Sequence, residues 1–145
     1  MLDSNGDSDK LKLERVKHVR YLSNNLSSLP SSMKSLDASR PWLIYWCLHS
    51  LLTLGVTLDN QSKARAVNTL LKFQNPNGGF GGGNGQLSHL LTTYAAIMSF
   101  IIVGSPGDNN GWDNIDRIGI YNFLMKLKQA DGSFIVHEGG EVDVR

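Results

Sequence analysis

The 145-residue sequence predicts an all-α fold of stacked helical hairpins. Apolar residues recur at helical spacing in several segments, and no stretch shows the strong polar–apolar alternation of a strand. The chain also repeats itself after 54 residues: 68–72 (NTLLK) matches 122–126 (NFLMK), and 77–80 (NGGF) matches 131–134 (DGSF). Such a recurring helix and glycine turn is typical of repeats that bury their faces against neighbouring copies. We therefore expect the array to continue beyond residue 145.

The chain begins with a polar, acidic segment, residues 1–10, which we expect to be a disordered tail. Residues 11–145 then form one helical unit. Its first helix is expected over 11–29, before the segment 29–35 (LPSSMKS) breaks the pattern. The apolar stripe of this helix consists of Leu13, Val16, Val19 and Leu22.

The second helix, residues 41–54, is apolar nearly all round. Pro41 suits a first helical turn, with Asp37 or Ser39 available to cap it. Gly55 is a suitable stop. A helix of this composition is expected to be buried on several sides.

A glycine-rich loop, residues 75–85, separates a helix over 60–74 from a helix over 89–103. We expect Ser88 to cap the later helix and Gly104 to end it. No strand precedes the loop and no Gly-Lys-Ser/Thr follows it, so a close helix–helix turn explains the glycines better than a phosphate site does.

The last helix is expected over residues 113–128, before the turn at 130–133. Ile115, Ile118 and Met125 form its apolar stripe.

Composition excludes several classes of function. The net charge of +1 gives no attraction to nucleic acid or to an anionic membrane. The longest uncharged apolar stretch, about 90–103, is shorter than the roughly 20 residues of a membrane-spanning helix. The single cysteine, Cys47, permits no disulfide framework, and no signal peptide is visible. We therefore expect a cytoplasmic protein without membrane insertion.

A few residues are candidates for function, each with a structural alternative. Trp42 and Trp46 lie four residues apart and share one helix face, where they serve either core packing or a pocket. Tyr94 has the same two explanations. His89 opens a helix after the glycine loop and is either a helix-end residue or a pocket residue. His49, on an apolar helix, is interpreted as a core residue, and the dispersed histidines predict no metal site.

Five ordered motifs carry a resemblance to a known family. They are LDASRPW (36–42), GGFGGG (78–83), HLLTTY (89–94), DGSF (131–134) and GGEVDVR (139–145). With this spacing the chain resembles the β subunits of protein farnesyltransferase from about residue 13 to residue 145. The related geranylgeranyltransferase β subunits share the glycine turns but usually lack Arg-Pro-Trp before the Tyr-Trp helix.

The resemblance implies an α–α barrel, or toroid, of which this chain would hold only the first part. Its partners would be a farnesyltransferase α subunit, farnesyl diphosphate and CaaX-motif proteins, with zinc and magnesium as cofactors of the full-length enzyme. The family's metal ligands and diphosphate-binding groups lie later in the barrel. We therefore expect no catalytic residue, no bound metal and no activity in this fragment, whose end inside GGEVDVR favours truncation.

The resemblance also implies roles for individual residues. Trp42, Tyr94 and Arg145 would bind the isoprenoid, and Trp42 would narrow the lipid pocket in favour of a farnesyl chain. The peptide would contact Ala38, Ser39, Trp42, Trp46, His89, Leu91 and Thr92.

One departure from the family pattern affects specificity. The family commonly has Ala-Pro after His-Leu, where this chain has Leu91-Thr92. The larger leucine predicts that peptides with a bulky last residue such as Met or Phe are disfavoured. Two alternatives remain open: a geranylgeranyltransferase β subunit, and a non-catalytic helical-repeat module that binds peptides or a partner.

Overall fold

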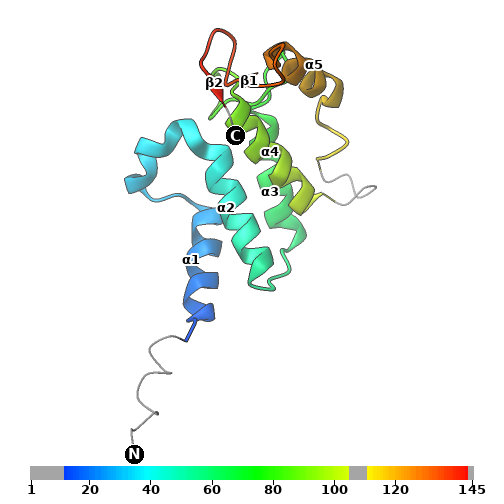
Figure 1. Ribbon diagram of the computed structural model, residues 1–145. Helices are drawn as coiled ribbons and strands as arrows, with labels where there is room; N and C mark the ends of the chain where they lie inside the picture. The colour runs from blue at the N-terminus through cyan, green and yellow to red at the C-terminus, as the bar shows by residue number, and fades with distance from the viewer. Residues whose placement is uncertain (1–11, 105–110, 144–145) are drawn as a thin grey trace, which may run out of the picture.

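The computed structural model describes residues 12–104 and 111–143 and is mainly helical (Figure 1). The predicted tail, residues 1–10, and Arg145 lie outside the described residues. The helices are α1 (Arg15–Ser27), the 3₁₀ segment η1 (Ser31–Ser39), α2 (Arg40–Thr53), α3 (Asn60–Leu71), α4 (Leu90–Val103) and α5 (Arg117–Leu127), followed by two short strands, β1 (Phe134–Ile135) and β2 (Val142–Asp143).

Helices α2, α3 and α4 form the centre of the molecule, and α2 packs most extensively against α4 (Figure 1). Helix α1 packs against α2 and α3, while η1 arches between α1 and α2. The core lies between these helices and the glycine loop. Its most buried members include Leu48, Leu70, Phe80, Ala96 and Phe100, each 0% exposed.

The predicted repeat is confirmed at the level of backbone hydrogen bonds. In the first copy Gln74 bridges to Phe80, and in the second, 54 residues on, Lys128 bridges to Phe134. The turn glycines at corresponding positions, Gly78 and Gly132, have φ values of 88° and 90°, a conformation that only glycine adopts without strain. The same backbone turn therefore follows α3 and α5.

The two short strands, β1 and β2, were not predicted. Phe134 pairs with Asp143 and Ile135 with Val142 in an antiparallel ladder. Strands of two residues are too short to show alternation in the sequence, and the predicted all-α class is confirmed.

Several predicted helix boundaries and caps also differ. Helix α1 begins at Arg15, and none of its side chains is buried. Neither Asp37 nor Ser39 caps α2 with its side chain; the Asp37 carboxylate instead accepts from the side chains of Arg40 and Gln86. A charged neighbour and a longer-range amide donor therefore take up the oxygens that would have capped the helix.

Helix α4 is capped by His89 rather than by the predicted Ser88. The Ser88 hydroxyl donates to Asn77 Oδ1 at 2.6 Å and accepts from the Asn75 amide at 2.9 Å. Both contacts hold the glycine loop, so Ser88 is not available to the helix. The predicted stop is confirmed, because α4 ends at Val103 with Gly104 as its C-cap.

Helix α5 begins later than predicted, at Arg117, where Asp116 Oδ1 accepts the Gly119 N–H at 2.8 Å. Its predicted apolar stripe was wrong within the helix, because Ile118 is 76% and Met125 41% exposed, while the buried Ile115 precedes the helix. The buried side chains of this helix are Ile120, Phe123 and Leu127.

Candidate functional site

Five aromatic side chains gather where α2 packs against α4. We call them the aromatic face: Trp42, Tyr45, Trp46, His49 and Tyr94. The Trp42 ring centroid lies 5.6 Å from that of Trp46 and 5.8 Å from that of Tyr94. Tyr45 lies 6.2 Å from Tyr94 and 5.5 Å from His49. These distances fall within the range of attractive aromatic pairing, so the rings form one continuous surface.

The aromatic face is open to solvent. Trp46 is 51% exposed and Tyr94 is 48% exposed. Leu52 on α2 and Ile101 on α4, also more than half exposed, extend the apolar surface along the same two helices. A contiguous exposed apolar patch of this kind usually marks a surface that binds a ligand or another protein. Of the two explanations for Trp42 and Trp46, the pocket therefore fits better than core packing.

The Tyr45 hydroxyl adds no charge to the aromatic face. Burial, followed by the neighbouring Tyr94 phenol, raises the pKa of Tyr45 above its ordinary value, so its hydroxyl stays protonated at neutral pH. Helix α2 also carries Cys47, whose thiol pKa is raised by burial. A neutral, buried thiol is a poor nucleophile and a poor metal ligand, so Cys47 serves packing.

The glycine loop holds the end of η1 beside α2. The Arg40 N–H donates to the Gly82 carbonyl at 3.0 Å. A Cβ on Gly82 would lie 1.9 Å from the Ala38 carbonyl oxygen, so only glycine permits this approach. The loop therefore fixes Ala38 and Ser39, two of the predicted peptide-binding residues.

The same loop is joined to the beginning of α4 through Phe80. The Phe80 carbonyl accepts the His89 N–H at 3.1 Å and the Thr92 hydroxyl at 2.6 Å. The Phe80 N–H donates to the Thr93 hydroxyl at 2.9 Å. Thr92 is 6% exposed, so its side chain braces the loop and leaves little surface for a ligand.

His89 caps α4 through its ring. Its Nδ1 accepts the Leu91 N–H at 3.2 Å, which requires that nitrogen to be unprotonated. The His89 ring lies 5.7 Å from the ring of His137, and the Leu90 N–H donates to the Val136 carbonyl at 2.7 Å. The sequence allowed two roles for His89, at a helix end or in a pocket. The structure shows the helix-end role. Because the ring is only half-buried, a further role in the pocket stays a prediction.

The structure thus brings together three of the predicted site residues, Trp42, Trp46 and Tyr94. The glycine loop bonds to Arg40, which follows Ala38 and Ser39, and to His89, whose ring accepts the Leu91 N–H. The roles of Ala38, Ser39, His89 and Leu91 in binding peptide remain predictions.

Sequence reasoning missed part of the face. Tyr45 and His49 follow Trp42 by three and seven residues, a helical spacing that could have found them. The interpretation of His49 as a core residue was wrong, because the ring is exposed and stacks on Tyr45. The pairing of His137 with His89 leaves no such signal in the sequence.

Among residues 12–104 and 111–143, no three His, Cys, Asp or Glu side chains are placed to hold a metal ion. Within the same residues, no helix is long and apolar enough to cross a membrane.

Comparison with known proteins agrees with this architecture. Residues 13–145 match the prenyltransferase alpha-alpha toroid domain. This chain belongs to the prenyltransferase alpha-alpha toroid family. The predicted toroid class is therefore confirmed.

Several relatives of this chain are farnesyltransferase β subunits. The chain is 44% identical to protein farnesyltransferase subunit beta of Pyricularia oryzae over 92% of this chain and 25% of the relative. The identity to the Schizosaccharomyces pombe subunit is 44%, over 97% of this chain and 35% of the relative. The identity to the Arabidopsis thaliana subunit is 42%, over 93% of this chain and 27% of the relative.

The chain is 28% identical to the geranylgeranyl transferase type-1 subunit beta of Arabidopsis thaliana, over 95% of this chain and 42% of the relative. The predicted resemblance to farnesyltransferase β subunits is thus confirmed. The chain spans about a quarter to a third of the length of the farnesyltransferase relatives named above.

Proposed function

We propose that this chain is part of the β subunit of a protein farnesyltransferase. Such an enzyme joins a farnesyl group from farnesyl diphosphate to the cysteine of a C-terminal CaaX motif. The observation that carries the proposal is the aromatic face of Trp42, Trp46 and Tyr94, found in a chain with 42–44% identity to farnesyltransferase β subunits. The enzyme would act in the cytoplasm with a farnesyltransferase α subunit as its partner.

The aromatic face supplies the part of this reaction that needs an apolar surface. An isoprenoid chain and the aliphatic side chains of a CaaX peptide both lose water-exposed apolar area when they lie on the rings of Trp42, Trp46 and Tyr94. The half-exposed Trp46 and Tyr94 have this area still available. In the reaction, a bond forms between the cysteine sulfur and C1 of the farnesyl group, the C1–oxygen bond breaks, and diphosphate and the thiol proton leave.

The proposed residues position substrates and do not activate them. Zinc in the full-length enzyme would lower the pKa of the substrate thiol, with magnesium as a further cofactor. The described residues do not fit a zinc site, because no three candidate ligands converge and the Cys47 thiol is buried. The metal ligands are therefore expected elsewhere in the full-length protein.

Two alternatives predict different outcomes of one assay. A geranylgeranyltransferase β subunit would use the longer isoprenoid, and a non-catalytic helical-repeat module would bind peptide without transfer. Among these relatives, each matched over more than nine-tenths of this chain, the identity is 28% to the geranylgeranyl subunit and 42–44% to the farnesyl subunits, which favours the farnesyl substrate.

The test is prenyl transfer to a fluorescent CaaX peptide by the full-length chain with a matching α subunit and zinc. Farnesyl diphosphate should be used in preference to geranylgeranyl diphosphate, and the 145-residue chain with the same α subunit should be inactive. Peptide binding without transfer by the full-length complex would favour the binding module. Activity of the 145-residue chain would contradict our assignment of its residues to positioning alone.

A further inference from the structure

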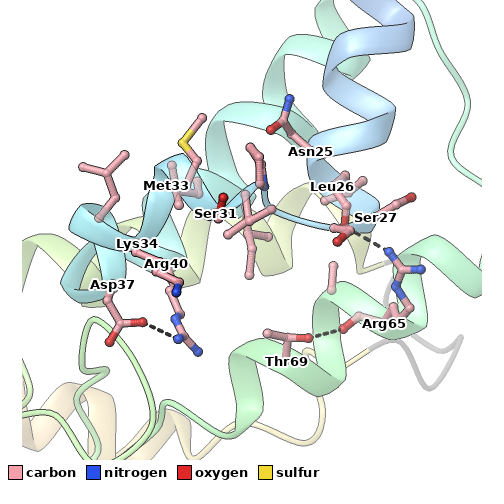
Figure 2. A pocket seen from close by; sticks show the side chains of 17 residues that line it. Asn25, Leu26, Ser27, Ser31, Met33, Lys34, Asp37, Arg40, Arg65 and Thr69 are labelled. Carbon is pink, nitrogen blue, oxygen red and sulfur yellow. Dashed lines mark hydrogen bonds and ion pairs between the residues drawn. The ribbon is translucent and has the colours of Figure 1, made fainter.

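A cavity lies beside α2, apart from the aromatic face. It occupies about 400 Å³ between the end of α1, the arch of η1, α2 and α3 (Figure 2). Pockets of about 300–1,000 Å³ are the size that small organic ligands occupy. The volume is thus sufficient for a ligand of modest size.

The cavity and the aromatic face use different residues of α2. Leu43 and Ile44 line the cavity, and none of the five residues of the aromatic face does. At about 100° per residue, Ile44 points about 160° away from Trp46, while Leu43 lies between the two surfaces. A molecule in the cavity would therefore not touch the aromatic face, and the proposed prenyl-transfer site does not account for the cavity.

One part of the cavity lining is apolar, and it lies beside the polar side chains of Asn25, Ser31 and Thr69. Leu43, 8% exposed, and Ala66, 5% exposed, belong to its floor, and Leu26 and Met33 lie on its wall. A ligand must therefore present an apolar body to be desolvated there favourably.

The arch of η1 that closes one side of the cavity has little protein packed against it. None of its side chains is buried, and Leu36 is 37% exposed. Leu29, which also lines the cavity, is 43% exposed. A ligand between these side chains and the floor would cover apolar area that the protein leaves to water.

The rim of the cavity is basic. Its charged residues are three cations, Lys34, Arg40 and Arg65, and one carboxylate, Asp37 (Figure 2). Arg40 pairs with Asp37, which neutralises one cation. The Arg65 guanidinium donates to the Leu26 carbonyl at 3.0 Å and is thereby held over the edge of the cavity without losing its charge. The remaining excess charge at the rim is positive.

We propose that this cavity binds a small amphipathic anion: an apolar chain that fills the space between η1, α2 and α3, with one carboxylate or phosphate head at Arg65. Lys34 adds positive charge at another part of the rim (Figure 2). The apolar lining selects the chain, and the uncompensated cations select the sign of the head group. A neutral chain would lose the head-group contact, and a cationic amphiphile would be repelled from the rim.

The test uses the protein at its native length and isothermal titration calorimetry with decanoate, decyl phosphate and decyltrimethylammonium as probes, all below their micelle-forming concentrations. Decanoate or decyl phosphate should bind at least about tenfold more tightly than decyltrimethylammonium. The tighter of the two anions then identifies the head group. Equal affinity for anion and cation, or no binding of either anion, would overturn the proposal.

Variants place the bound probe in this cavity. Thr69 is exposed on α3 and lines the cavity, so Thr69→Phe should fill it and abolish anion binding. The double variant Lys34→Gln/Arg65→Gln should weaken binding about five- to tenfold, because it removes the head-group contact at Arg65 and the positive charge of Lys34 at the rim. The matched double variant Arg20→Gln/Lys72→Gln removes the same charges from exposed positions outside the cavity and should leave affinity unchanged.

Circular dichroism shows whether each variant is folded. If Thr69→Phe does not fold, the double variant and its matched control decide the outcome, since all four of their positions are on the surface. Anion binding that persists unchanged in a folded Thr69→Phe, or that falls equally in both double variants, would place the anion elsewhere and refute the proposal.

Discussion

Replacing Gly82 by alanine tests how the glycine loop fixes the end of η1. The added Cβ would lie 1.9 Å from the Ala38 carbonyl oxygen and 2.7 Å from its Cα. Both partners are backbone atoms, so no rotamer change relieves the contact, and the two segments must separate by about 1 Å. That movement also stretches the 3.0 Å hydrogen bond from the Arg40 N–H to the Gly82 carbonyl.

The two effects give a magnitude. Overpacking costs about 1–3 kcal/mol and the weakened hydrogen bond about 1 kcal/mol, so Gly82→Ala should destabilise the fold by roughly 3 kcal/mol. For a chain of this size the loss corresponds to a melting temperature lower by about 10 °C. Thermal and urea unfolding followed by circular dichroism measure both quantities.

Gly85→Ala in the same loop is the matched control. Gly85 has a φ of 73° and nothing within 4 Å of an added Cβ, so alanine there costs only the left-handed conformation, about 1 kcal/mol. Both variants change the unfolded chain in the same way, so their difference isolates the contact with Ala38. If Gly82→Ala destabilises the protein no more than Gly85→Ala does, the loop does not brace η1 and the reasoning fails.

Three further predictions concern specificity and pH. In the full-length enzyme, Trp42→Ala should shift the ratio of kcat/KM toward geranylgeranyl diphosphate by about tenfold or more, because removal of the indole lengthens the apolar space; competition between the two diphosphates measures it. Leu91→Ala should raise kcat/KM for peptides ending in Met relative to peptides ending in Ser, by a factor that corresponds to about 1–3 kcal/mol. A native enzyme that already prefers Met would contradict the premise. The Ser133 hydroxyl and N–H lower the pKa of Asp131, so its contribution to stability is present above the carboxylate's unfolded pKa and is lost as the pH falls through the folded value. Asp131→Asn should therefore flatten the acid side of the stability curve, which urea unfolding between pH 3 and pH 6 (about the range for a carboxyl group) measures.

Local features of the sequence predicted much of the fold correctly. The helices followed from apolar spacing, and the recurrence of NGGF as DGSF predicted two equivalent turns, which the backbone bridges at Gln74 and Lys128 confirm. These signals are reliable because helical periodicity and glycine turns depend on residues that are adjacent in the chain.

The caps were predicted less well, because a capping side chain has competing partners that the sequence does not place. The Ser88 hydroxyl donates to Asn77 of the glycine loop, and the Asp37 carboxylate accepts from Arg40 and Gln86. His89 takes over the cap of α4 through a ring nitrogen. Each choice depends on which loop lies nearby, and that is known only once the helices are packed.

The sequence by itself determined the helical class, the repeat and the family resemblance, and it singled out Trp42 and Trp46 as sharing one face. Only the tertiary structure decided that this face is open, that Tyr94 joins it from a helix far along the chain, and that Leu43 and Ile44 of α2 line a cavity with a basic rim. The physical reason is that a helix made of apolar residues on every side does not specify its neighbours. Burial of each side depends on which helices and loops pack there, and those contacts join residues that are distant in sequence.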